Sequence, residues 1–233
     1  VVFDAGGLDL KPSKGIAIMK KDMGGAASVI GLTQMIVQSK LPICLRVLIP
    51  MVENLPSGHS YRTSDVIKSR SGLSVEVGNT DAEGRLILAD ALTEACSDNP
   101  DLLIDMATLT GAARVALGTQ VPVFFTNDEM IQNDLLEISK LINDPVWPLP
   151  LYGPYNSLLQ SDIADISSTG SSAYGGAIVA GLFLKSFVSD ETRWIHFDLM
   201  AWNLNSTPGR PRGGEAMGIR TLYEMLKTKY SME

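Results

Sequence analysis

The sequence is poor in cysteine, histidine and aromatic residues, and it contains no long apolar run. Two cysteines, Cys44 in an apolar strand-like stretch and Cys96 near a predicted helix end, are too few for a disulfide framework. We expect both to be buried thiols of a reducing compartment. No apolar stretch approaches the roughly 18 residues that a membrane span needs, and no secretory signal is visible. These absences predict a cytoplasmic protein without a membrane partner.

Several familiar catalytic patterns are also absent. The two histidines do not form a His-Glu-x-x-His zinc motif. We expect His59 to be exposed in a polar loop and His196 to be a hydrogen-bonded core residue. No Gly-x-Ser-x-Gly elbow of a serine hydrolase and no phosphate-binding loop occur. The net charge of −7 argues against a nucleic-acid partner.

What is present is a well-buried α/β pattern. Hydrophobic residues make up 45% of the chain, and apolar runs at strand spacing alternate with amphipathic stretches at helical spacing. We therefore predict one domain over 1–233, a three-layer α/β/α sandwich around a mostly parallel mixed sheet. The predicted helices are 23–39, 84–97, 128–142, 175–187 and 218–229, with a short helix or turn at 111–118, and the predicted strands are 1–3, 43–49, 102–106, 121–126 and 194–199.

The most informative stretch is the octapeptide Asn79-Thr80-Asp81-Ala82-Glu83-Gly84-Arg85-Leu86. In an extended segment, Asp81, Glu83 and Arg85 would point the same way, as a metal-binding edge with a fixed cation beside it. The alternative is a helix N-terminus, with Thr80 or Asp81 as the cap and Glu83 in the first turn. Both interpretations can hold at once.

A second acidic stretch precedes it. Phe3-Asp4-Ala5-Gly6-Gly7 leads through Lys11 to Met19-Lys20-Lys21-Asp22-Met23-Gly24-Gly25. Asp4 could be only a turn residue before two glycines, and Asp22 only a helix cap. Together with Asp81 and Glu83, however, they make four acidic groups, and burying such charges unpaired costs several kcal/mol each. A pair of divalent cations would remove that cost.

These two stretches, in this order, resemble the leucyl aminopeptidase family, the di-metal exopeptidases of the cytosol. The resemblance continues through Asp105-Met106-Ala107-Thr108-Leu109-Thr110-Gly111-Ala112, Trp194-Ile195-His196-Phe197-Asp198 and Gly218-Ile219-Arg220-Thr221-Leu222. It covers essentially the whole chain as a catalytic domain. It implies an aminopeptidase that removes N-terminal, preferably apolar, residues from peptides.

The resemblance also implies a ligand set. Asp4 and Glu83 would each contact both metal ions, Asp22 would complete the shell of one ion, and Asp81 that of the other. Hard carboxylate ligands suit Zn²⁺, Mn²⁺ or Mg²⁺, and we expect two ions per chain, manganese or zinc.

Two cationic residues are given catalytic roles by the same resemblance. Lys11 would polarise the scissile carbonyl and stabilise the oxyanion. Arg85 would anchor a bicarbonate ion that serves as general base for the attacking water, since a guanidinium matches a planar anion. Without the resemblance, Lys11 would be an ordinary surface lysine and Arg85 a partner in a salt bridge.

The resemblance further implies a substrate pocket lined by Met19, Asn79, Thr108, Leu109 and Gly111. Met19 and Leu109 could equally be plain core residues. The chain departs from many family members at Met200-Ala201, where they carry Ala-Gly. Met200 could narrow the pocket, so a strict preference for leucine does not follow.

A further departure concerns the start of the sequence. The family has another metal-ligating lysine five residues before the position of Asp4, which falls before Val1. We expect that the upstream N-terminal domain and the start of the catalytic domain are missing from this record. The family also implies a homo-oligomer, a hexamer. Two alternatives stay open: a non-catalytic oligomeric scaffold that kept the shell of the site, and a di-metal amidase with another substrate.

Overall fold

The structure, a computed structural model, describes residues 1–231. Its helices are α1 Ser13–Ile16, α2 Gly24–Gln38, α3 Glu83–Cys96, α4 Gly111–Leu117, α5 Glu129–Leu141, α6 Gly176–Lys185 and α7 Ile219–Tyr230, with short 3-10 helices η1 Met19–Met23, η2 Thr80–Ala82 and η3 Gly153–Leu159. Its strands are β1 Phe3–Asp4, β2 Glu53–Asn54, β3 Val66–Lys68, β4 Ser74–Glu76, β5 Leu103–Ala107, β6 Val123–Thr126, β7 Trp147–Pro148, β8 Ile166–Ser167, β9 Trp194–Asp198, β10 Trp202–Asn203 and β11 Gly213–Gly214.

The largest sheet within residues 1–231 has the strand order β5-β9-β6-β7. β5 runs parallel to β9, with Asp105 opposite His196. β6 runs antiparallel to β9 and parallel to β7. The sheet is therefore mixed, as predicted. Separately, β1 pairs in parallel with β2, β4 pairs with both β3 and β8, and β10 pairs with β11.

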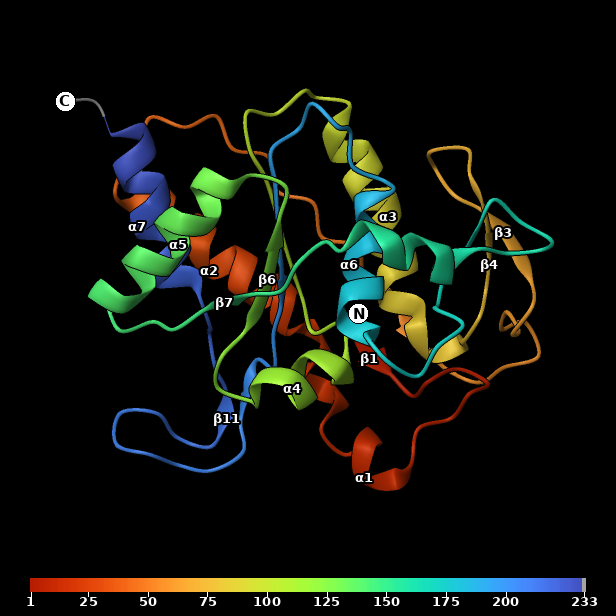
Figure 1. The fold of residues 1–233 in the computed structure, drawn as a ribbon. Coiled ribbons are helices and arrows are strands. Elements are labelled where there is room, and N and C mark those ends of the chain that lie inside the picture. Colours follow the sequence, from red (N-terminus) through yellow and green to blue (C-terminus); the bar gives the residue numbers. More distant parts are fainter. Residues whose placement is uncertain (232–233) are drawn as a thin grey trace.

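Helices cover both faces of this sheet. Figure 1 shows α2, α5 and α7 gathered on one side and α3 and α6 on the other. Two apolar clusters fill the layers, and β9 contributes to both because successive side chains of a strand point to opposite faces. Ile195 and Phe197 belong to the cluster with α2, α5 and α7, whereas Trp194 belongs to the cluster with α3 and α6. The predicted three-layer α/β/α fold is confirmed.

Hydrophobic periodicity located the main helices well. α3 buries Ala89 and Leu92, and Leu86, Leu88 and Cys96 pack beside them in the same cluster. None of the helices formed by residues 1–231 is long and apolar enough to cross a membrane.

The predicted strand at 43–49 is wrong. This segment forms no strand, and Cys44, Leu45 and Val47 are exposed. An apolar run makes a strand only where a neighbouring strand offers free backbone groups, and this segment has no ladder partner in the described chain. The expectation that Cys44 is a buried thiol is therefore also wrong.

Close packing of α2 on β5 sets the position of η1, which carries Asp22. A Cβ atom at Gly25 would lie 2.1 Å from the Met106 carbonyl oxygen, and one at Gly24 would lie 2.2 Å from the Ala201 Cβ. Side chains at these positions would push the helix away from the strand. Two glycines thus let the first turn of α2 reach the backbone of the sheet.

Candidate functional site

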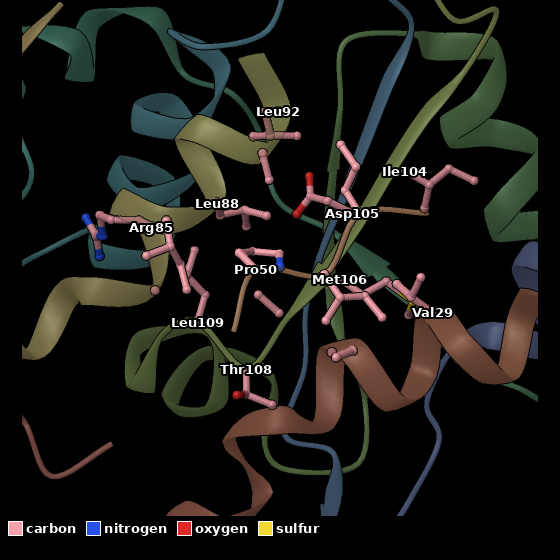
Figure 2. Close-up of a pocket in the computed structure, with 18 of the residues that line it drawn as sticks. Val29, Pro50, Arg85, Leu88, Leu92, Ile104, Asp105, Met106, Thr108 and Leu109 are labelled. Atoms are coloured by element: carbon pink, nitrogen blue, oxygen red, sulfur yellow. The ribbon is translucent and has the colours of Figure 1, made fainter. Parts of the chain in front are cut away.

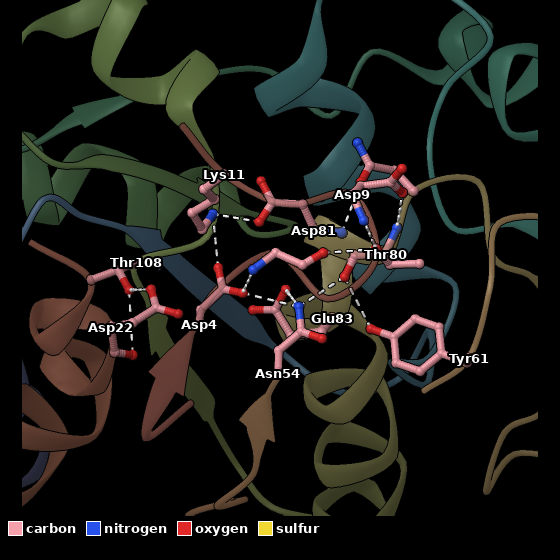
Figure 3. A network of polar contacts seen from close by, with 12 residues as sticks. Asp4, Asp9, Lys11, Asp22, Asn54, Tyr61, Thr80, Asp81, Glu83 and Thr108 are labelled. Carbon is pink, nitrogen blue, oxygen red and sulfur yellow. Dashed lines mark hydrogen bonds and ion pairs between the residues drawn. The ribbon is translucent and has the colours of Figure 1, made fainter. Parts of the chain in front are cut away.

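Three carboxylates from separate elements converge at one point. Asp4 ends β1, Asp81 lies in η2, and Glu83 begins α3. One carboxylate oxygen from each lies within 4.8 Å of the others, and Asp4 and Glu83 are buried. Figure 3 shows these side chains turned toward one another.

The octapeptide reaches this point as a helix start and not as an extended edge. β4 ends at Glu76, and Thr80–Ala82 is already a 3-10 turn that leads into α3. The cap is Asn79, whose side-chain oxygen accepts a hydrogen bond from the Asp81 N–H at 2.7 Å. The extended interpretation and the choice of Thr80 or Asp81 as cap are therefore wrong, while Glu83 in the first turn is confirmed. Asp81 and Glu83 come together because they lie in neighbouring turns. Alternation along a strand plays no part.

Lys11 joins two of the three carboxylates. Its Nζ lies 2.8 Å from Asp4 Oδ2 and 2.5 Å from Asp81 Oδ1. Burial acts to lower the pKa of Lys11, but the hydrogen bonds and charges of Asp4 and Asp81 outweigh burial and hold it above its usual value. The ammonium group therefore stays protonated at neutral pH.

Asn54 is a site residue that the sequence did not reveal. Its side-chain nitrogen donates to Asp4 Oδ1 at 2.9 Å, to Glu83 Oε2 at 3.0 Å and to the Thr80 carbonyl at 2.9 Å. Asn54 is buried at the end of β2, beside β1. No local motif marks it. Only the pairing of β1 with β2 brings it to the carboxylates.

The loop between Asp4 and Lys11 is tied to the start of α3. The Thr80 hydroxyl donates to the Gly6 carbonyl at 2.7 Å, and the Asp9 carboxylate accepts from the Thr80 N–H at 2.7 Å. Gly6 has φ +96°, and a Cβ atom there would lie 2.4 Å from the Asp9 carbonyl oxygen, so this turn requires glycine. The loop thereby holds Lys11 against Asp4 and Asp81.

Asp22 lies at the same cavity but outside the group of three. Its Oδ1 accepts a hydrogen bond from the Thr108 hydroxyl at 2.5 Å, which fixes the carboxylate at the end of β5. Asp22 is close enough that its charge contributes to raising the pKa of Glu83.

Burial and mutual repulsion make the charged forms of these carboxylates unfavourable. Burial, followed by the charge of Asp4, raises the pKa of Glu83 to about 8. Burial also raises the pKa of Asp81, against the opposing effect of Lys11. Clustered, buried carboxylates of this kind are suited to bind divalent cations through oxygen. The donor set of Asp4, Asp81 and Glu83, with Asp22 nearby, fits such ions.

Arg85 is buried behind the carboxylates. Its Nη1 donates to the Ser168 carbonyl at 2.7 Å, while Nε is buried without a hydrogen-bond partner among residues 1–231. Burial lowers the pKa of Arg85 to about 10, so the group remains charged at neutral pH. A fixed guanidinium with a free N–H in a buried place can bind an anion.

A cavity of about 1030 Å³ opens at this site and extends along β5 between α2 and α3 toward segment 42–50. Figure 2 shows Arg85, Leu88 and Leu109 along one part of it and Val29 and Met106 along another. The predicted site residues that line it are Asp4, Lys11, Met19, Asp22, Asn79, Asp81, Glu83, Arg85, Thr108, Leu109 and Gly111. Met200 is buried and does not line this cavity.

Two further cations that the sequence did not reveal as site residues line the same cavity. Lys21 is 3% exposed, and its Nζ has no hydrogen-bond partner in the described chain. The Nη1 atom of Arg114 is also buried and has no hydrogen-bond partner among these residues. Burial, followed by the charge of Arg114, lowers the pKa of Lys21 to about 8. A lysine between another lysine and an aspartate gave no local signal of burial.

The histidines behave as predicted. His59 is exposed. His196 is fully buried, with Nδ1 2.5 Å from Asp105 Oδ1, and Asp105 also accepts from the Trp194 indole at 2.7 Å. Asp105 is thus paired within the sheet.

Comparisons with known proteins point to the same aminopeptidase family that the sequence motifs resemble. The family model described as the cytosol aminopeptidase family, catalytic domain, matches residues 1–223. A probable cytosol aminopeptidase from Chlorobium limicola is 45% identical over 228 residues, which are 97% of this chain and 45% of that protein. A probable cytosol aminopeptidase from Mycobacterium leprae is 42% identical over 230 residues, 97% of this chain and 44% of that protein.

Solved structures agree. The crystal structure of the cytosol aminopeptidase from Coxiella burnetii superposes with a TM-score of 0.97 at 50% identity, covering 99% of this chain and 50% of that one. The bottromycin maturation enzyme BotP in complex with Mn superposes with a TM-score of 0.93 at 38% identity, covering 99% and 52%. The chain spans about half the length of the relatives it matches. It therefore belongs to the cytosol aminopeptidase family and corresponds to the catalytic domain of that family.

Proposed function

We propose that this chain is the catalytic part of a di-metal aminopeptidase, which removes the N-terminal residue from peptides. The observation that carries this proposal is the convergence of Asp4, Asp81 and Glu83 beside Lys11, in a chain of the cytosol aminopeptidase family. BotP, a relative of the same fold, is described in complex with Mn.

Asp4, Asp22, Asp81 and Glu83 would hold two divalent ions, manganese or zinc. Their oxygen donors suit such ions, and a bound cation would remove the repulsion that raises the pKa of Glu83. Divalent ions bound there would supply Lewis-acid polarisation of the carbonyl and activation of water. Asn54 would keep Asp4 and Glu83 oriented through its side-chain nitrogen.

Lys11 would act on the substrate carbonyl. Its ammonium is held in place by Asp4 and Asp81 and stays protonated. A positioned N–H donor stabilises the negative charge that develops on a carbonyl oxygen under attack. Lys11 is therefore the electrophile of this proposal.

Arg85 would hold a bicarbonate ion. The contact to the Ser168 carbonyl fixes the guanidinium, and the Nε N–H is left without a hydrogen-bond partner among residues 1–231. Bicarbonate bound there would supply a proton acceptor for the reaction.

The first side chain of the peptide would lie against Met19, Asn79, Thr108, Leu109 and Gly111, which all line the cavity. The apolar surfaces of Met19 and Leu109 favour a substrate with apolar methylene groups at this point.

The decisive experiment follows hydrolysis of leucine p-nitroanilide by the complete gene product with Mn²⁺ or Zn²⁺ added. Activity that a chelator removes and metal restores supports the proposal. N-blocked leucine anilide is the matched control and should not be cleaved. Cleavage of blocked and free substrates alike would indicate an amidase, and a folded, metal-loaded protein without activity would indicate a scaffold.

Replacing Arg85 separates its proposed role from a structural one. We expect Arg85→Ala to keep its bound metal and lose about a hundredfold or more in turnover, the lower range for a missing acid–base contribution. Added bicarbonate should raise the turnover of the wild type and not of the variant. Loss of bound metal in Arg85→Ala would instead mean that the residue is structural.

We also propose a cytoplasmic homo-oligomer, a hexamer, in keeping with the family of the chain. Light scattering of the complete gene product after size exclusion should give six times the mass of one chain. A monomeric mass across the micromolar range would contradict it.

A further inference from the structure

Two neighbouring cations, Lys21 and Arg114, line the cavity of the proposed active site, and within residues 1–231 Lys21 Nζ and Arg114 Nη1 have no hydrogen-bond partner. Lys21 belongs to η1 and Arg114 to α4, so two separate elements bring them together. Of the charged side chains around Lys21, Arg114 acts on it most strongly. Buried like charges side by side are costly unless an anion lies between or beside them.

The charges of Asp22 and Asp198 act on Lys21, but neither carboxylate forms a hydrogen bond with it. Asp22 is engaged by the Thr108 hydroxyl. Asp198 is engaged by the Leu109 and Thr110 N–H groups and accepts from the Thr110 hydroxyl at 2.6 Å. Within residues 1–231, neither Lys21 Nζ nor Arg114 Nη1 has a hydrogen-bond partner. Both donors are thus unpaired, and because neither nitrogen is exposed, a group that enters the cavity would bind them by displacing the atoms that cover them.

The two cations lie beside the part of the cavity that would take the first side chain of a peptide. Lys21 is two residues after Met19 in the same 3-10 helix, and Arg114 is one turn after Gly111 in α4. All four residues line the cavity. The pocket therefore combines an apolar wall with a cationic part.

We propose that Lys21 and Arg114 form a carboxylate-binding end of this pocket, which selects peptides that begin with an acidic residue, glutamate above all. The two methylene groups of glutamate would pack on Met19, and its carboxylate would supply the hydrogen-bond acceptor that Lys21 Nζ and Arg114 Nη1 lack. Charge-assisted hydrogen bonds to a guanidinium and an ammonium in a buried site are strong. This inference rests on the proposed aminopeptidase function.

The test compares p-nitroanilides of glutamate and glutamine at neutral pH with the metal-loaded complete gene product. The pair has the same shape and differs in charge, and an anilide has no C-terminal carboxylate that could be bound instead. We expect kcat/KM for glutamate to exceed that for glutamine by about tenfold or more, as one charge-assisted contact provides. Lys21→Met and Arg114→Met should each reduce this ratio toward one.

Lys20→Met is the matched control, because Lys20 is the neighbouring residue, is exposed, and has its ammonium over Trp202, 5.3 Å from the ring centroid. It should keep the wild-type ratio. A glutamate-to-glutamine ratio at or below one, or a ratio that Lys21→Met and Arg114→Met leave unchanged, overturns the inference even if leucine anilide is cleaved.

A binding measurement separates this failure from failure of the proposed function. If no anilide is cleaved, the aminopeptidase proposal fails, and calorimetric titration with free L-glutamate and L-glutamine decides the inference. Binding of glutamate about tenfold tighter than glutamine, lost in Lys21→Met, supports a carboxylate site. Equal affinities, or glutamate binding that Lys21→Met does not change, overturn it.

Discussion

At the scale of single residues, Asp4 is the point on which the site converges. Its carboxylate accepts from the Gly6 N–H at 2.8 Å and from Asn54, and it pairs with Lys11. These contacts fix both of its oxygens in a buried place. The same carboxylate is a main reason why the pKa of Glu83 is raised. Asp4 is therefore held in a fixed orientation and is also one cause of the raised pKa of Glu83.

The raised pKa of Glu83 predicts how the metal-free protein responds to pH. A carboxyl with a pKa of about 8 when folded and an ordinary value of 4.5 when unfolded binds more protons in the folded state between these limits. Stability of the metal-free protein should therefore fall as pH rises through this window. Glu83→Gln should flatten the fall. Denaturant midpoints measured in chelator at several pH values between these limits check it, and an equally steep fall in the variant would contradict it.

Asn54 should matter for both stability and metal affinity. Asn54→Ala leaves the Thr80 carbonyl and two carboxylates without their donor, which should cost about 1–3 kcal/mol of unfolding free energy. Metal affinity should fall about 10- to 100-fold, as for other residues that orient ligands. Urea unfolding and metal titration measure both effects. Asn156→Ala, at an exposed position, is the control, and equal behaviour of the two variants would refute the role of Asn54.

At the scale of elements, the approach of α2 to β5 sets the distance between Asp22 and the other carboxylates. A methyl group at Gly25 would meet the Met106 carbonyl at 2.1 Å, whereas one at Gly31, in the same helix, would meet only the end of Ile219 at 3.4 Å. The first contact requires the helix to move. The second is close to an ordinary van der Waals contact.

These two glycines predict opposite effects of the same substitution. Gly25→Ala should destabilise the protein by about 1–3 kcal/mol, as overpacking does, and should weaken metal binding by shifting η1. Gly31→Ala should stabilise it by up to about 1 kcal/mol, because alanine favours the helix. Chemical unfolding of both variants decides, and destabilisation of equal size in both would show that the contact with Met106 does not control the packing.

Local pattern predicted the helices and the buried strands, because their periodicity reflects burial on one face. α3 and β9 are examples. It failed at 43–49, where the fate of an apolar run depends on which strand is available as a neighbour. At the site, the acidic motifs predicted the carboxylates and Lys11. The sequence did not reveal Asn54, Lys21 and Arg114 as site residues, because only tertiary packing brings them to the cavity.

At the scale of the molecule, the sandwich brings the ends of β1 and β5 and the starts of α3 and α4 to one cavity. The carboxylates, Lys11 and Arg85 come from different segments of the chain, and the two apolar clusters on either side of the sheet hold those segments in place. A di-metal site is the chemical interpretation of this arrangement that we propose.

Metal stoichiometry tests that central claim most directly. The complete gene product, freed of metal and then equilibrated with Mn²⁺ or Zn²⁺, should bind two ions per chain by elemental analysis, and Asp4→Asn should bind fewer. We expect two bound ions in the wild type and fewer in Asp4→Asn. A wild-type protein that is folded and binds none or one, or an Asp4→Asn variant that still binds two, would contradict it.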